Sequence, residues 1–498
     1  MILIMKKIRS VSALLFCLLA ASIACAQSPP RPDIVLRGTI TGKQNHTYEM
    51  VPFDVPSGIV ALTVTFHYTG HEQRTTIDLG LFDPQRFRGW SGGNKSTFTV
   101  SESNATPSYL PGPILPGTWK LILGVPNIRP GATSQYEADI YFARQDGEES
   151  FTDQPLRNGP AWYRGDLHMH TAHSDGSCLS QSGRKVPCPV FLTAQAASER
   201  GLDFIAVTDH NTDSHEDALR ELQPYFDQLL FVPGREITTF WGHANLFGPT
   251  QFFDFRVGDT TTTRSLFERA EKLHAILSIN HPNAPTGEEC MGCGWTPQQQ
   301  FDPRLVHVME AVNGGDEDGP HASISFWEKY LDQGLRVTAI GGSDNHNAQI
   351  PAGKTNAIGR PETVVYADNL SVPSLLDAIR KGHVFVDLSA SRDRILDVSA
   401  TDNQQMAKMG DALAAPANST IAISAHLVAC QGLLLRFLLD GQPVHALQTN
   451  IQQTEQVLAL TLKADGKKHW LRPDVVTPEG RLVLLGNPIY LNYTESRE

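Results

Sequence analysis

The pattern of apolar and polar residues changes along the chain, and its first region is the simplest. Between residues 29 and 145, short runs alternate apolar with polar side chains and are separated by Gly, Pro and Thr. Such alternation is typical of half-buried strands, because successive side chains of a strand point to opposite faces. Runs of this kind occupy residues 60–66, 76–82 and 119–125. The pattern predicts an N-terminal β-sandwich over residues 29–145.

A different pattern covers residues 161–390, after a linker at residues 146–160. Apolar residues at helical spacing predict helices over residues 189–200, 216–228, 263–272, 326–333 and 371–381. Between them lie short apolar runs typical of buried strands, at residues 204–208, 230–232, 275–279 and 337–340. Strands that alternate with helices predict a parallel sheet, and we expect this sheet to close as a barrel.

The two ends of the chain differ again. Residues 395–498 contain strand-like runs such as 420–425 and 432–441, which predict a C-terminal β-rich domain. Residues 1–26 have the pattern of a cleavable secretory signal, so we expect a periplasmic or secreted protein. Cys25 raises a lipoprotein as the alternative, but Ser22 stands where the lipidation motif prefers Leu. No later apolar run is long enough to span a bilayer.

Candidate metal ligands begin directly after the linker. His168 and His170 are two residues apart, so both imidazoles of an extended strand point to the same side. Asp175 follows beyond a short turn and adds an oxygen ligand. Imidazoles combined with a carboxylate suit Zn, Mn or Fe better than Ca. For the two histidines alone, an accidental cluster on a half-buried strand is the alternative.

Further residues of this kind come directly after the predicted strands, which argues against an accidental cluster. They are Asp209 and His210 after residues 204–208, Glu236 after 230–232, His281 after 275–279, and Asp344 with His346 after 337–340. Active sites of barrels gather where strands end and loops begin. The sequence therefore predicts a metal site at this end of the sheet.

Four motifs, in this order, resemble the polymerase and histidinol phosphatase (PHP) superfamily of metal-dependent hydrolases. They are Asp-Leu-His-Met-His-Thr at 166–171 with Ser-Asp-Gly at 174–176, Thr-Asp-His-Asn at 208–211, His-Pro at 281–282, and Ser-Asp-Asn-His at 343–346. The resemblance covers about residues 161–390. Within the superfamily, Gly-Arg-Glu-Ile-Thr at 234–238 and Gly-His-Ala-Asn at 242–245 are similar to the carbaryl-hydrolase (CehA/McbA) branch.

The resemblance implies a distorted (β/α)7 barrel that holds two or three divalent ions of Zn, Mn or Fe. It assigns His168, His170 and Asp344 to one ion, Glu236 as a bridge to a second ion with His281 and His243, and Asp175, His210 and His346 to the third. Closely spaced ions lower the pKa of a bridging water, which supplies hydroxide, and they stabilise charge on the attacked phosphoryl or carbonyl oxygen.

Four residues are predicted to take part in catalysis, namely Glu236, Asp344, His173 and Arg235. His173 and Asp209 are expected to support the ligands, because ligating imidazoles need a partner for their second nitrogen. Arg235, Arg164 and Lys354 are candidates to face a phosphate, although each alone is more often a solvated charge. The histidines outside the motifs are expected to be structural, with His321 also a candidate for substrate contact; they are His215, His274, His307, His321 and His383.

The acidic composition of the chain limits the kinds of partner that it can bind. The formal net charge is −12 at pH 7, which argues against binding long nucleic acids. We favour an exported metal-dependent phosphoesterase with a small-molecule substrate, and a carbamate or carboxyl ester hydrolase with the same site is the alternative. The other class is a non-enzymatic protein whose β-domains contact a cell surface or carbohydrate. Trp90 and Tyr109 are candidates for sugar contact there, but we favour a structural role for both.

The cysteines of the expected mature chain form two close pairs and one remainder. Export favours disulfides between Cys178 and Cys188 and between Cys290 and Cys293, which leaves Cys430 unpaired. A zinc site built from the first four is the alternative.

Overall fold

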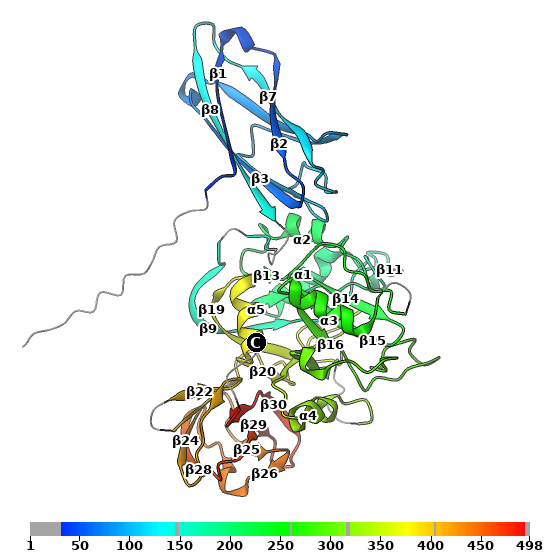
Figure 1. Ribbon diagram of the computed structural model, residues 1–498, viewed down its shortest axis with the longest axis vertical. Coiled ribbons are helices and arrows are strands. Elements are labelled where there is room, and N and C mark those ends of the chain that lie inside the picture. The colour runs from blue at the N-terminus through cyan, green and yellow to red at the C-terminus, as the bar shows by residue number, and fades with distance from the viewer. Residues whose placement is uncertain are drawn as a thin grey trace, which may run out of the picture.

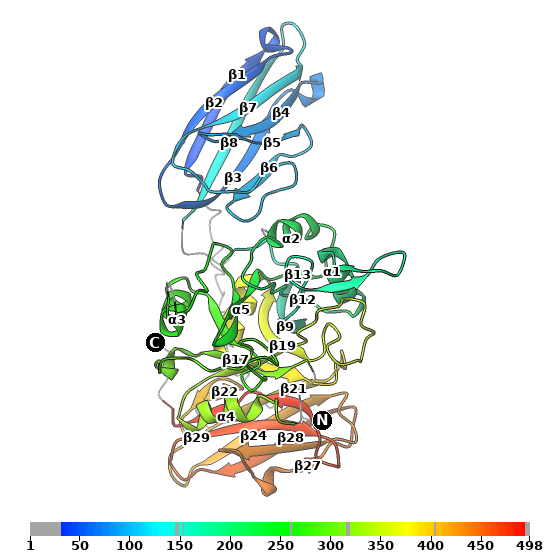
Figure 2. The same ribbon diagram turned by 90° about the vertical axis from the view of Figure 1, so that its right-hand side faces the viewer.

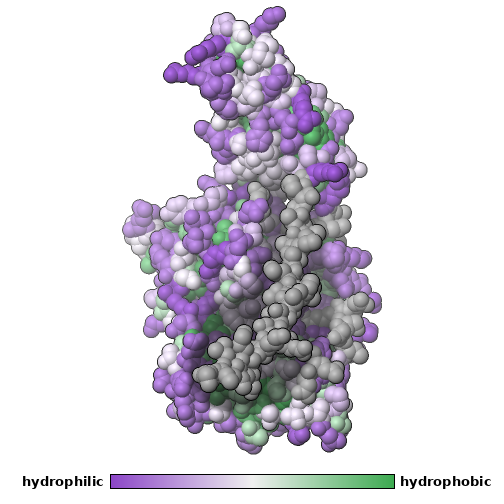
Figure 3. Space-filling model, turned by 90° about the vertical axis from the view of Figure 1, so that its left-hand side faces the viewer, coloured by the Kyte–Doolittle hydropathy of each residue, from purple (hydrophilic) through white to green (hydrophobic). Residues whose placement is uncertain are grey.

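The computed structural model describes residues 31–144, 149–152, 154–258, 261–314, 319–402 and 405–493. The signal predicted at residues 1–26 lies outside these ranges. The molecule is elongated, with a β-sandwich at one end, a mixed α/β part in the middle and a second β-rich part at the other end (Figure 1). Hydrophilic residues cover most of the face shown in Figure 3, and apolar residues gather there only in small areas. No helix within the described ranges is long and apolar enough to cross a membrane.

The N-terminal part consists of two four-stranded antiparallel sheets, in the strand orders β1-β8-β3-β6 and β2-β7-β4-β5. The inward-facing residues of both sheets share one apolar core, in which Trp119 and Leu62 are fully buried. The strands are β1 (Ile34–Thr41), β2 (Tyr48–Val55), β3 (Ile59–Tyr68), β4 (Thr76–Phe82), β5 (Phe87–Gly92), β6 (Thr97–Ser101), β7 (Gly117–Asn127) and β8 (Thr133–Arg144).

Polar contacts join this sandwich to the middle part. The backbone N–H of Ala105 donates to Asp217, and the guanidinium of Arg220 donates to the side-chain oxygen of Asn104. Tyr109 is buried and stacks on Phe98, with 3.9 Å between the ring centroids. Its role is therefore structural, and it presents no surface to a sugar.

The middle part carries the five α-helices of the described residues. Its elements are β9 (Arg157–Asp166), β10 (Ser177–Leu179), β11 (Lys185–Pro187), α1 (Val190–Glu199), β12 (Phe204–Ile205), α2 (Glu216–Leu222), β13 (Leu230–Phe231), β14 (Gly234–Thr239), β15 (Gly242–Phe247), α3 (Thr263–Lys272), β16 (Ile276–Ile279), β17 (Val308–Asn313), α4 (Ile324–Asp332), β18 (Thr338–Gly342), β19 (Glu362–Leu370), α5 (Val372–Lys381) and β20 (Val384–Asp387).

These strands do not form the single closed barrel of seven β/α units that we expected. They divide between a sheet that contains β13-β12-β9-β19-β20 and a five-stranded sheet, β14-β15-β16-β17-β18. Between these two sheets, the described residues form only isolated β-bridges, which join Met169 to Asn345 and His210 to Glu236. The tight turn between β14 and β15 is one departure from the expected β/α repeat, because a parallel pair needs a crossover of a dozen or more residues, whereas these two strands pair antiparallel.

The C-terminal strands continue the first of these sheets. β20 pairs with β30, so one twelve-stranded sheet runs from β13 to β26. The sheet is therefore continuous across the domain boundary that we expected at residues 390–395. A separate sheet, β22-β21-β24-β28, packs against it (Figure 2). The strands are β21 (Ile395–Thr401), β22 (Met406–Lys408), β23 (Ala412–Leu413), β24 (Thr420–Val428), β25 (Leu434–Leu439), β26 (Gln442–Pro443), β27 (Thr449–Asn450), β28 (Glu455–Lys463), β29 (His469–Val476), β30 (Leu482–Gly486) and β31 (Ile489–Leu491).

One of the two predicted disulfides is present. Cys290 is linked to Cys293, whereas Cys178, Cys188 and Cys430 are buried free thiols. The prediction of a Cys178–Cys188 disulfide is therefore wrong. In the register of β10 and β11, Cys178 lies opposite Val186 and Cys188 follows two residues later, so the two thiols are near each other but not covalently linked. Burial raises the pKa of Cys188 to about 12, and a hydrogen bond with Cys178 contributes to this rise.

Candidate metal centre

The predicted ligands come together at the edge where the two sheets of the middle part meet. His168 and His170 follow β9, His210 follows β12, and Glu236 and His243 lie on the hairpin of β14 and β15. His281 follows β16, and Asp344 with His346 follows β18. The backbones of His281 and Asp344 have positive φ angles of 25° and 51°, which are rare for residues with a Cβ and mark locally strained conformations.

Glu236 is the centre of the cluster. Its carboxylate is fully buried, and histidine nitrogens of five different residues lie around its two oxygens. The distances are 3.4 Å to His168, 3.8 Å to His170, 2.7 Å to His210, 3.3 Å to His243 and 3.3 Å to His281. A carboxylate with nitrogens on both oxygens is suited to bridging two cations.

A second carboxylate lies on the other side of the paired histidines. One oxygen of Asp344 is 3.3 Å from His168 Nε2 and 3.2 Å from His170 Nε2. His168, His281 and Asp344 offer three ligand atoms within 4.8 Å of one another.

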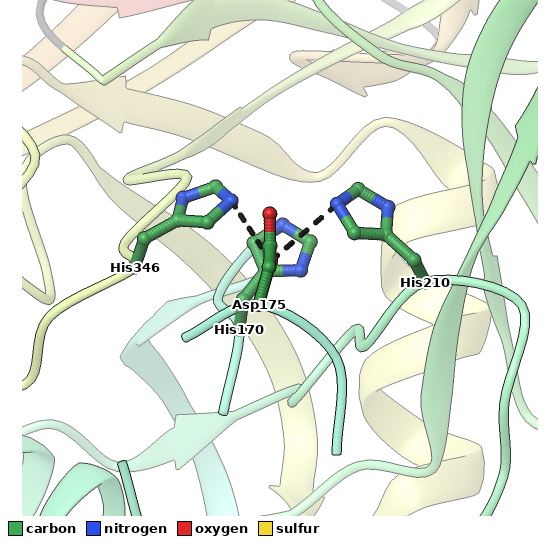
Figure 4. A group of neighbouring side chains, drawn as sticks. All are labelled: His170, Asp175, His210 and His346. Atoms are coloured by element: carbon green, nitrogen blue, oxygen red, sulfur yellow. Dashed lines mark ion pairs between the residues drawn. The ribbon is translucent and has the colours of Figure 1, made fainter. Parts of the chain in front are cut away.

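Asp175 forms the third group, at the exposed end of the cluster. Its carboxylate lies 3.3 Å from His346 Nε2 and 3.7 Å from His210 Nε2 (Figure 4). The ring of His170 stacks between those of His346 and His210, with centroid distances of 4.2 and 4.4 Å. The structure therefore brings together all nine residues predicted as metal ligands.

The donor atoms fit a divalent transition metal. Four ligands placed tetrahedrally at 2.0–2.2 Å from a zinc ion lie about 3.4 Å from one another, and most of the spacings above are close to that value. Several buried nitrogens of these residues also make no hydrogen bond, namely His170 Nδ1, His243 Nε2 and His281 Nδ1. Since buried polar atoms are normally satisfied, these orphaned atoms fit a site that could hold a cation.

The electrostatics of the cluster agree with this conclusion. Burial alone would raise the pKa of Glu236 and Asp344, but the surrounding histidines, His168 prominent among them, hold both well below their usual range. Burial would lower the pKa of His168, yet Asp344, Glu310 and Glu236 together raise it well above its ordinary value. Both carboxylates are therefore ionised and available as anionic ligands at neutral pH.

The donor group around Asp175 predicts how the affinity for a metal ion depends on pH. Burial would lower the pKa of His346, but its hydrogen bond to Asp175 and the charge of Asp344 outweigh this and raise it to about 9. Metal-free protein should therefore carry a proton on His346 at pH 7.5, which an ion must displace. Affinity at this group should fall by up to about tenfold per unit as the pH drops below that pKa.

This expectation can be checked by NMR titration of His346 and by measuring proton release during metal titration. In metal-free Asp175→Asn protein, the pKa of His346 should move back toward 6.5. A raised pKa benefits the folded state, so this contribution to stability is present below about pH 6.5 and is lost as the pH rises through about 9. An unchanged titration of His346 in the variant would contradict the assigned pairing.

Glu310, which we did not predict, orients the ligands from behind. It lies on β17, and its carboxylate contacts His168 Nδ1 at 2.9 Å and accepts a hydrogen bond from the backbone N–H of His281. Asn313 donates to the same carboxylate. This contact leaves His168 Nε2 directed at Glu236 and Asp344, which is the usual arrangement of a carboxylate behind a ligating histidine. A lone Glu within the buried run Val-Met-Glu-Ala-Val was the available signal in the sequence.

Glu310→Gln should weaken metal binding by about 10- to 100-fold, because it removes the charge that orients His168. Isothermal titration of metal-free protein gives the affinity directly. Glu328→Gln is the control. Glu328 lies on α4 and pairs with Arg472, away from the cluster, so this variant should leave the affinity unchanged. Equal affinities in the two variants would show that Glu310 has no part in ligand orientation.

Asp209 and Asp166 fix the loops that carry the ligands. Asp209 accepts hydrogen bonds from the backbone and hydroxyl of Thr171 and from Ser174, so it holds the turn before Asp175. Asp166 is fully buried and accepts backbone N–H groups of His168, Ser343 and Gly359.

Several other predicted residues do not join the donor groups. Arg235 is buried and turns toward the carbonyl of Pro249 and toward Asp213, while Arg164 pairs with Glu362 at 2.6 Å. His173 is exposed and its Nδ1 contacts Ser214 at 2.8 Å. Lys354 is exposed in the loop after His346, and no contact places it at the cluster.

The remaining histidines outside the motifs mostly make structural contacts. His215 contacts the carbonyl of Gly234, His383 contacts Asp411, and the backbone of His274 accepts a hydrogen bond from Arg380. His321 contacts the carbonyl of Asn283, two residues after His281, so it lies beside a segment that leaves the metal centre.

Comparison with known proteins adds little to this geometry. The chain matches no protein-family model and no curated protein. Among solved structures, it is similar to a two-domain protein from Bacteroides vulgatus ATCC 8482 described as containing a predicted PHP-like metal-dependent phosphoesterase. The identity is 18%, the match covers 70% of this chain and 99% of the other, and the TM-score is 0.35. So low a TM-score carries no functional assignment, and the CehA/McbA branch finds no support here.

Proposed function

We propose that this chain is a metal-dependent hydrolase of the PHP superfamily and that phosphoesters are its substrates. The observation that carries the proposal is Glu236, one buried carboxylate with five histidines around it and a second carboxylate, Asp344, across the pair His168 and His170. A non-enzymatic surface protein would have no need to retain this complete and partly strained donor set.

Each residue has a role in this proposal. Glu236, Asp344, Asp175 and the six histidines of the donor groups hold two or three divalent ions, for which Zn, Mn and Fe suit the nitrogen and oxygen donors. Such ions, when bound, activate water as a nucleophile and stabilise negative charge on the attacked group. Glu310 and Asp209 keep the ligands in place, and His173 is our candidate for proton exchange with the departing group at the exposed side.

One observation favours carbamate or carboxyl esters as the second candidate substrates. Of the cationic side chains that the sequence suggested as phosphate contacts, Arg235 turns to the carbonyl of Pro249 and Arg164 pairs with Glu362, so neither is directed at the donor groups. The negative charge of a phosphate dianion would therefore be neutralised by the bound ions alone. A neutral ester carries no such charge and needs no cation besides the ions. The predicted signal peptide would place either activity in the periplasm or outside the cell.

The test uses the purified mature chain, reconstituted with Zn, Mn or Fe, on matched substrates. We expect chelator-sensitive hydrolysis of a phosphomonoester or phosphodiester, and Asp344→Asn is the inactive comparison. Hydrolysis of aryl carbamates or carboxyl esters alone would transfer the assignment to the second candidate. Full ion content without hydrolysis of any of the four substrate types would refute the enzymatic proposal.

A further inference from the structure

The two most exposed large apolar side chains of the described residues lie on segments that leave the metal centre. Phe240 is 82% exposed and Met291 is 80% exposed. Phe240 occupies the turn between β14 and β15, the hairpin that carries Glu236 and His243. Met291 belongs to residues 282–296, the segment that begins directly after His281. Single exposed apolar side chains are common, so the informative feature here is that both lie on segments that begin at the candidate ligands.

The two segments are fixed against each other. A Cβ added to Gly292 would lie 2.5 Å from the carbonyl oxygen of Thr239 and 2.9 Å from the Cα of Phe240, so only glycine permits this approach. The backbone N–H of Thr296 donates to the carbonyl of Trp241 at 2.8 Å. The Cys290–Cys293 disulfide closes the turn that carries Met291. Phe240 and Met291 therefore belong to neighbouring, anchored backbone segments.

The hairpin connects this apolar pair to the metal ligands. Glu236 and Thr238 lie on the same face of β14, because side chains of a strand alternate. His243 lies directly opposite Thr238 in the register, and the hydroxyl of Thr238 contacts His210 Nδ1 at 2.6 Å. Phe240 follows two residues after Thr238, in the turn that joins β14 to β15. The hairpin that holds these ligands therefore bears the exposed ring at its turn.

We propose that Phe240 and Met291 form a rim that binds an uncharged apolar group of the substrate, such as the aryl ring of an ester. This inference rests on the proposed function and specifies its substrate class. The occupant follows from the position of the rim, on the two segments that supply Glu236, His243 and His281. Charge points to the same occupant, since exposed Glu288 and Glu289 on the Met291 segment disfavour an anionic leaving group.

Binding of two phosphonates separates the rim from the metal centre without any turnover. Calorimetry on the metal-reconstituted full chain compares phenylphosphonate with methylphosphonate. We expect the phenyl compound to bind about tenfold more tightly, which is a usual effect of partly burying one ring. In the double variant Phe240→Ser with Met291→Ser the two affinities should become nearly equal, while the affinity for methylphosphonate and the ion content stay unchanged.

Tyr225→Ser is the matched control, because Tyr225 is 72% exposed beside α2, outside the hairpin and the 282–296 segment. The control should keep the full preference for the phenyl compound. The proposed rim is wrong if the double variant still binds phenylphosphonate more tightly than methylphosphonate, or if the parent protein shows no such preference. If the double variant lost binding to lipid vesicles but kept its preference for the phenyl compound, the two side chains would form a membrane contact. That result would also contradict the proposed rim. Failure of both phosphonates to bind ion-loaded protein would count against the proposed phosphoesterase and so remove the basis of the rim.

Discussion

Glu236→Gln should reduce turnover on the order of 10³-fold while the fold persists. Glutamine has the size of glutamate but replaces one anionic oxygen with an amide and removes the charge. Glu236 contacts ligand nitrogens from three segments that follow strands and from His243 on β15, so no other side chain can take over its position between the donor groups. Steady-state kinetics on any substrate that the parent hydrolyses, together with metal analysis, measure the effect.

Glu216→Gln is a matched control for this substitution. Glu216 is also fully buried, but burial raises its pKa well above the ordinary value, whereas the pKa of Glu236 is held well below it. Glu216 belongs to none of the donor groups, so the same exchange of oxygen for nitrogen there should leave turnover within a few-fold. If Glu236→Gln kept near-normal kcat with full ion content, the assignment of Glu236 as the bridge would have to be abandoned.

Local structure was the part of this fold that the sequence predicted well. Residues 275–279 were expected as a buried strand and β16 is Ile276–Ile279, and the helix expected at 371–381 is α5. The helix expected at 216–228 ends at Leu222, because Pro224 cannot continue it. Short-range periodicity contains this information, since it depends on which face of one element is buried.

The arrangement of the sheets was not predictable from the same pattern. Apolar runs show that strands are buried, but they do not show which strands pair. β14 and β15 pair antiparallel through a two-residue turn at Phe240 and Trp241, where we expected only parallel neighbours. The pairing of β20 with β30 joins residues about a hundred positions apart, and no local feature of the sequence indicates it.

The clustering of the predicted ligands could be predicted because their side chains are chemically distinctive and most of them directly follow strands. Supporting residues were harder to find. Glu310 and Asp166 act through hydrogen bonds to other residues, and a carboxylate within a buried run does not reveal its partner. Arg235 shows the opposite error, since its position beside Glu236 in sequence suggested a phosphate contact, yet alternation along β14 sends its side chain to the other face.

Removing the metal should abolish activity and also lower the melting temperature. The donor groups bring Glu236, Asp344 and Asp175 together with six histidines, and several of their buried atoms have no hydrogen-bond partner. Bound ions would satisfy these atoms, and a ligand that binds only the folded state adds about 2.7 kcal/mol to stability at a hundredfold excess over its Kd. Chelated protein should therefore melt several degrees earlier, and activity should return on adding Zn, Mn or Fe.

Metal analysis of the reconstituted chain gives the decisive number, for which we expect two or three ions per chain. Asp344→Asn should lose at least one ion, because Asp344 contacts both His168 and His170. Glu328→Gln, away from the cluster, should keep the full complement. Fewer than one ion per chain after supplementation, with a melting temperature that does not respond to chelator, would mean that the histidines and carboxylates neutralise one another in the native protein. The raised pKa of His168 and the lowered pKa of Asp344 would then describe its resting state.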